Sequence, residues 1–319
     1  MSGASGDRGA GPQGRLAQAA TVDATADSIY DLGYRGYQGV HLGRPHAVGS
    51  LVKQSFRQSW GLGRPGRAKI VPFGLAALAT VPAIVALGIS ALAKQLGAAD
   101  MIEAASPIRY ETYYPVIGQI VFLFAAAQAP ELLGRDQRHR VLALFFSRAI
   151  RREDYATAKL FALGGAMLAF LLFPLAVIFV GRALLAADVV AGVVADAAEV
   201  PAIVGEAMLT AWLLAAMSLA IASFTPRRAY ATAAIFAVVV IPAVTVGALS
   251  ELAPGQVVGA VSLLSPGDVL DGANAFVFGN ALAGPPSVSM PSVAYVGSAL
   301  AMIAVSTAIL VARYLRIEP

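Results

Sequence analysis

The sequence predicts an all-α integral membrane protein with six transmembrane helices. Of its 319 residues, 58% are hydrophobic and only 13% are charged, whereas soluble domains carry roughly 25% charged residues. The apolar residues also gather in runs of the length that a bilayer requires, since roughly 20 of them cross about 30 Å of hydrocarbon as a helix. A helix is the expected form because lipid offers no hydrogen-bond partner to the backbone.

Six apolar runs qualify as spans and place the transmembrane domain at residues 70–319. The runs are 70–93, 113–133, 160–184, 203–224, 231–249 and 292–314. The fifth run is short and is followed closely by Glu251. Residues 29–69 precede the first span as a cytosolic segment. Residues 1–28 are small and polar, which is typical of a disordered tail.

The basic residues predict the orientation of these spans. Twenty of the 23 Lys and Arg residues lie before the first span, in the connections after the second and fourth spans, or at the C-terminal end. The other side receives only Lys94, Arg109 and Arg182. Because cytoplasmic loops are enriched in Lys and Arg, both termini are expected in the cytoplasm, with the chain multi-pass in the plasma membrane.

An amphipathic helix is expected at residues 46–63, before the first span. Its apolar and small residues recur at three- and four-residue steps; they are Val48, Leu51, Val52, Ser55, Phe56, Ser59 and Trp60. With its basic flanks, this pattern favours a helix lying in the inner membrane interface. The alternative is a packed cytosolic helix.

The connection between the fifth and sixth spans, residues 250–291, is unusually apolar for an outer loop. Proline-containing turns divide it into two short apolar pieces that are too short to span. They are expected to form re-entrant or interfacial helices over the outer mouth of a path, where Phe276 and Phe278 are the predicted outer gate.

The sequence lacks the residues of a self-powered pump or a metalloenzyme. It contains no G-x-x-x-x-G-K-[ST] phosphate-binding pattern, and none of its three histidines has a second ligand at i+4. Ionisable groups are almost absent from the spans, and those near span ends, Glu131, Glu206 and Arg182, can reach an interface. We therefore expect no metal or cofactor on this chain and no nucleic-acid partner.

Three stretches resemble the membrane permease subunits of ATP-binding-cassette transporters, in the type-two exporter group and particularly its actinobacterial members. They are YDLGYRGYQGVHLGRPHAVGSLVKQSFRQSWGLGRPGRAKIVPF, ELLGRDQRHRVLALFFSRAIRREDYATAKL and IASFTPRRAYATAAIFAVVVIPAV. The second resembles the family's loop after the second span, although Ala149 stands where family members often have proline. The turn after Arg148 is therefore less determined than in the family.

The resemblance implies a permease that exports its substrate with energy from separate subunits. Two copies of a nucleotide-binding ATPase would hydrolyse ATP with Mg, and a second permease, identical or homologous, would face this chain. A cytosolic coupling helix would lie between the second and third spans, where an apolar cluster is ringed by arginines. The predicted coupling residues are Arg138, Leu142, Phe145, Phe146 and Arg148. The alternative is that these arginines only set the topology and bind lipid.

Polar residues within the spans are the candidates for a translocation path. In the second span Gln119 shares a face with Phe122, whereas Gln128 shares another with Glu131; Thr245 of the fifth span is added by analogy with the family. Interhelical hydrogen bonding is the competing role for the two glutamines. Because no polar pocket is evident, we expect an amphipathic, lipid-like or drug-like cargo.

Two other classes of function remain open. A membrane scaffold or sensor would recruit cytosolic partners through the basic loop and move nothing. A lipid-modifying membrane enzyme would need polar residues clustered at one depth, and the sequence shows no such cluster.

Overall fold

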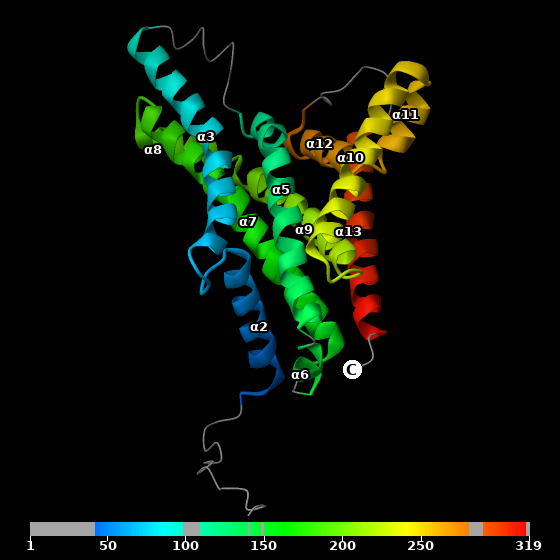
Figure 1. The fold of residues 1–319 in the computed structure, drawn as a ribbon. Coiled ribbons are helices and arrows are strands. Elements are labelled where there is room, and N and C mark those ends of the chain that lie inside the picture. Colours follow the sequence, from blue (N-terminus) through cyan, green and yellow to red (C-terminus); the bar gives the residue numbers. More distant parts are fainter. Residues whose placement is uncertain (1–41, 98–108, 140, 148–149, 281–289, 317–319) are drawn as a thin grey trace, which may run out of the picture. The chain divides into compact units, whose positions relative to one another are not determined.

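The computed structural model describes residues 42–97, 109–139, 141–147, 150–280 and 290–316, and every regular element in these ranges is a helix (Figure 1). In chain order the helices are α2 (Gly43–Ser59), α3 (Arg67–Gln95), α5 (Tyr110–Arg138), α6 (Leu142–Phe146), α7 (Arg152–Leu185), α8 (Val189–Ala197), α9 (Val200–Ala222), α10 (Arg228–Leu252), α11 (Gly255–Ser262), α12 (Pro266–Phe278) and α13 (Ser292–Leu315).

Six of these helices, α3, α5, α7, α9, α10 and α13, are long and apolar enough to cross a membrane. Each of the six predicted spans thus forms a helix of sufficient length and apolar composition, which supports a multi-pass membrane protein. The helices extend past the predicted apolar runs. The third begins at Arg152, because the carboxylate of Asp154 accepts a hydrogen bond from the Arg151 N–H at 2.9 Å and caps its N-terminus. Apolar composition marks the part of a helix that suits lipid, whereas capping decides where the helix begins.

Helix α9 lies at the centre of the bundle and contacts α5, α7, α10, α12 and α13. In its most apolar stretch 67% of residues are buried, against 11% in α10 and 17% in α13. Small residues allow this close approach: a Cβ at Gly164 of α7 would lie 3.4 Å from the Trp212 ring of α9. The exposed apolar faces of α10 and α13 are available to lipid or to another subunit.

Helix α2 packs against α7 and runs parallel to it. Arg44 bonds Asp154 at 2.7 and 2.8 Å, Phe56 lies beside Gly165, and the Trp60 ring lies 6.4 Å from Phe170. The apolar face expected from the periodicity is the face that packs on the core. Protein therefore covers that face. Whether α2 lies in the membrane interface or in the cytosol stays a prediction.

The connection between the fifth and sixth spans forms two short helices, α11 and α12, as expected, although residues 281–289 lie outside the described ranges. Helix α12 packs closely against α13. A Cβ at Gly272 would fall 2.3 Å from the Tyr295 ring, and the hydroxyls of Ser262 and Tyr295 are 2.8 Å apart. Whether these helices enter the bilayer stays a prediction.

The bundle has two ends, the α6 end and the α12 end, each called after a helix that lies there. At the α6 end, α6 and the start of α7 lie beside the end of α13, where Arg152 donates to the Leu315 carbonyl at 2.9 Å (Figure 1). At the α12 end, α12 lies beside the start of α5, where the Phe278 and Tyr114 rings are 6.3 Å apart (Figure 1).

Candidate functional site

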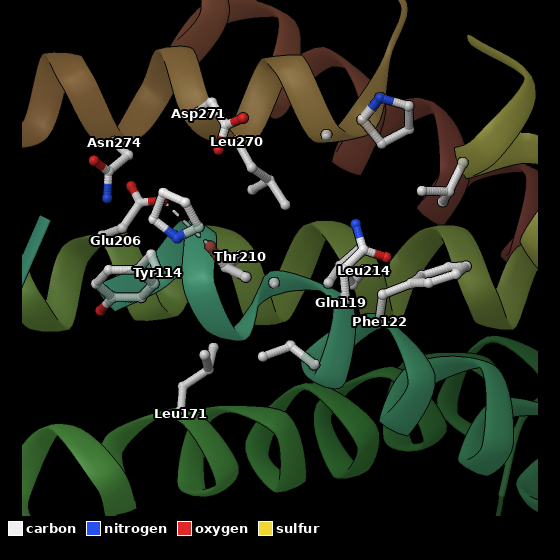
Figure 2. Close-up of a pocket in the computed structure, with 16 residues that line it drawn as sticks. Tyr114, Gln119, Phe122, Leu171, Glu206, Thr210, Leu214, Leu270, Asp271 and Asn274 are labelled. Atoms are coloured by element: carbon white, nitrogen blue, oxygen red, sulfur yellow. Dashed lines mark hydrogen bonds between the residues drawn. The ribbon is translucent and has the colours of Figure 1, made fainter. Parts of the chain in front are cut away.

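A pocket of about 150 Å³ lies at the α12 end, between α5, α9 and α12, with α7 and α10 completing its wall (Figure 2). Helix α5 contributes a run of residues on one face: Tyr114, Pro115, Gly118, Gln119, Val121 and Phe122. Gln119 and Asp271 are exposed, so the pocket is open beside them.

The polar side of the pocket is built from α9 and α12. Glu206 of α9 is only 1% exposed; its Oε1 accepts a hydrogen bond from Thr210 at 3.3 Å, and its Oε2 has no hydrogen-bond partner among the described residues. Asn274 of α12 is 8% exposed, and its Nδ2 also lacks a partner there. Figure 2 shows Asn274 and Asp271 facing Glu206 and Thr210 across the pocket. The site therefore presents one unpaired acceptor and one unpaired donor.

The ionisable groups that line this pocket are all acidic. Its described lining contains the carboxyl groups of Glu206 and Asp271 and no Lys, Arg or His. The pKa of Asp271 is raised, because surrounding protein partly removes its carboxyl from water and the Asp268 carboxylate repels its charge. Tyr114 brings no charge, and its hydroxyl donates to the Ile203 carbonyl at 2.6 Å. A buried carboxylate without a counter-charge is costly in an apolar surrounding.

This pocket corrects two expectations. Glu206 was expected to reach an interface from its place near a span end, and no polar pocket was evident. The structure instead encloses Glu206, because α12 packs over α9 and covers it. Sequence reasoning missed Thr210 and Asn274, although the i, i+4 spacing of Glu206 and Thr210 was a readable signal.

The predicted path residues fall in four different places. Gln119 and Phe122 line the pocket, as their shared face suggested, whereas Gln128 is buried on α5 outside it. Glu131 lies at the other end of α5, where it pairs with Arg64 at 2.6 Å and with Arg228 at 3.7 Å. Thr245 is exposed on α10 and donates to the Ile241 carbonyl. The structure thus brings together two of these five residues.

The two predicted gate residues are placed differently from each other. Phe278 is half-buried, and its ring is 6.3 Å from the ring of Tyr114, which lines the pocket. Phe276 is 47% exposed. Phe278 is therefore the one that borders the pocket.

A helix of five residues, α6, lies at the place of the predicted coupling helix; its coupling role stays a prediction. Phe145 and Phe146 are half-buried, with rings 5.6 and 6.1 Å from Tyr155 of α7, and Leu142 is also half-buried. Leu144 is 66% exposed. The large apolar residue that α6 exposes is thus Leu144, whereas the two phenylalanines pack α6 against the bundle.

The flanking arginines are only partly described. Arg138 is exposed and donates to the Pro226 carbonyl at 3.2 Å, so it joins the end of α5 to the turn between α9 and α10. Arg148, the other predicted coupling arginine, lies outside the described residues.

A buried ion pair lies beneath α6 and was missed by sequence reasoning. Lys159 of α7 is 1% exposed; its Nζ lies 2.8 Å from the Asp136 carboxylate and donates to the Leu132 carbonyl at 3.2 Å. The hydroxyl of Tyr155 donates to the same Asp136 carboxylate at 2.7 Å. Lys159 and Asp136 read in the sequence as ordinary charges flanking a span; only the packing of α5 on α7 brings them together.

The described part of the chain brings no three His, Asp or Glu residues together as metal ligands. No family model matches this chain, and no curated protein sequence matches it. The features that bear on function are therefore the pocket, α6 and the three stretches that resemble permease subunits of ATP-binding-cassette transporters.

Proposed function

We propose that this chain is the permease subunit of an ATP-binding-cassette exporter, which moves an amphipathic molecule with ATP hydrolysed by a separate subunit. The observation that carries the proposal is α6. This short helix lies between the second and third spans and exposes Leu144 while its phenylalanines pack on the base of α7. The resemblance supplies the ATPase partner and the direction of transport.

The contacts of α6 give it a means of acting on the spans. A five-residue helix would not persist alone in water, so packing against Tyr155 must stabilise it. Tyr155 bonds Asp136 of α5 and packs against Tyr314 of α13, whose ring is 5.0 Å away. A displacement of α6 by a cytosolic partner would therefore reach α5, α7 and α13 through one buried side chain.

The contact with the ATPase is proposed at Leu144. The sequence favoured Phe145 and Phe146 as the residues inserted into a partner groove, but their rings are engaged within this chain. Leu144 is free for a partner, and burying a leucine stabilises a contact by about 1.5–3 kcal/mol. Arg138 would serve the rim of that contact.

The pocket supports an amphipathic cargo, since it combines polar and apolar walls. The second permease subunit would cover part of the exposed apolar surface on α10, where Val240, Ile241 and Val244 are each exposed. The ATPase copies, ATP and Mg would remain on the side of α6.

One observation favours a second candidate, a lipid-modifying enzyme. Glu206, Thr210, Asp271 and Asn274 form a polar cluster at one depth, which such an enzyme would need. The described pocket offers no histidine, serine or cysteine beside Glu206, so the nucleophile of such an enzyme would be the Thr210 hydroxyl, which donates to Glu206. Mass spectrometry of lipids incubated with the purified chain would reveal a product if this function held.

The proposal predicts that a neighbouring reading frame encodes a phosphate-loop ATPase. It is tested by purifying the chain with that ATPase and measuring association, hydrolysis and transport in vesicles. Leu144→Ala should weaken association about tenfold, because it removes most of one buried leucine. Leu252→Ala is the matched control, since Leu252 is 84% exposed on α10, away from α6, and should leave association unchanged. No association of the wild-type chain with the ATPase, or unchanged association in Leu144→Ala, would contradict the proposal and leave a scaffold or sensor as the better account.

A further inference from the structure

The polar atoms of the pocket define part of the ligand. Glu206 offers a carboxylate oxygen that nothing in the described structure pairs, and Asn274 offers an unpaired N–H donor. None of the ion pairs among the described residues includes Glu206. Buried charges in membrane proteins are normally paired or mark a functional pathway. A ligand that satisfies this site carries a positive charge for Glu206 and an acceptor atom for Asn274.

The apolar atoms define the rest of the ligand. Phe122, Leu171, Leu214 and Val239 are among the apolar residues that line the pocket. In Figure 2 Phe122 lies at the opposite side of the pocket from Glu206 and Asn274. One part of the pocket is therefore suited to a charged head, and the other to a hydrocarbon or aromatic portion.

We propose that this pocket binds an amphipathic amine, with its ammonium group on the Glu206 carboxylate and its apolar portion toward Phe122. The proposal deepens the proposed function by naming the substrate class of the permease. Asn274 donates to an oxygen or nitrogen acceptor of the same molecule. Thr210 holds the other carboxylate oxygen and so orients Glu206 toward the ligand.

Two other occupants are less suited to the pocket. A metal ion takes several oxygen or nitrogen ligands, and the described residues bring no three His, Asp or Glu together. A proton on Glu206 would remove its charge, but it would explain neither the open space nor the unpaired amide of Asn274. The proton remains the rival outcome of the test.

The experiment measures binding of dodecylamine and of its neutral analogue N-dodecylacetamide to the full chain in lipid nanodiscs, with empty nanodiscs subtracted. Both probes have the same hydrocarbon tail, and only the amine is charged at neutral pH. The wild-type chain should bind the amine at least tenfold more tightly than the amide. Glu206→Gln should abolish this preference, Glu206→Asp should retain it, and Glu251→Gln, at an exposed glutamate of α10, should leave it unchanged.

Equal affinity of the wild-type chain for the two probes, which is the result for a protonated Glu206, would overturn the inference. So would a preference that survives in Glu206→Gln. The comparison of the two probes on the wild-type chain can contradict the proposal by itself, even if a variant fails to fold. Because the measurement uses neither ATP nor a partner, its failure is distinguishable from a failure of the ATPase to associate.

Discussion

The two ends of this bundle each bury an ionisable group, and the surroundings of the two groups differ. At the α6 end, Lys159 finds a carboxylate, a carbonyl and the ring of Tyr155 around it. At the α12 end, Glu206 receives one weak hydrogen bond from Thr210 and no counter-charge in the described structure. A buried charge that is fully paired within the chain has a structural role, since removing its partner destabilises the protein. A charge left half-paired beside an open pocket is available to a ligand.

The largest expected effect comes from breaking the paired charge. Lys159→Met should destabilise the chain by about 3 kcal/mol, because it leaves the carboxylate of Asp136, whose side chain is only 15% exposed, without its cationic partner. The thermal unfolding midpoint in detergent would fall accordingly. Adding Asp136→Asn should recover part of the loss, since no charge then remains unpaired. A midpoint unchanged by Lys159→Met would show that the two ends do not differ as described.

A smaller effect is expected from detaching α6. The double change Phe145→Ala and Phe146→Ala removes two ring contacts with Tyr155, each contributing about 0.5–1.5 kcal/mol. Limited proteolysis at residues 141–147 should become faster while overall stability changes little. ATPase association should fall as well, because Leu144 would no longer be held in place. Leu144→Ala is the control, and it should reduce association without raising proteolysis. Equal proteolysis in all three proteins would mean that the rings do not anchor α6.

The smallest effect is expected from removing the unpaired charge. Glu206→Gln should leave the unfolding midpoint unchanged or raise it by the equivalent of about 1 kcal/mol or less, since a neutral amide is easier to bury than an unpaired carboxylate. The same thermal assay measures it beside Lys159→Met. A fall comparable to that of Lys159→Met would indicate that Glu206 has a structural partner, and the comparison between the two ends would break down.

The spans could be predicted from the sequence because the hydrophobic run is a local property of the chain. The face of α2 was also predictable, since periodicity places Leu51 and Ser55 on one side; what covers that face was not, because α7 lies about 110 residues away in the chain. The pocket was missed for the same reason. Nothing local to Glu206 shows that α12 folds over it, and nothing local to Phe145 shows that Tyr155 occupies its face.

Helix α13 joins the two ends that have been contrasted. Near its start, Tyr295 is enclosed against Gly272 of α12, where no larger residue would fit. Near its finish, Tyr314 packs on Tyr155 and accepts a hydrogen bond from Gln137 at 3.2 Å. A helix of 24 residues is about 36 Å long and resists compression along its axis. Helix α12 beside the pocket and Tyr155 beneath α6 thus both pack against α13. Because α13 is rigid, a tilt of this helix at one end also moves its other end.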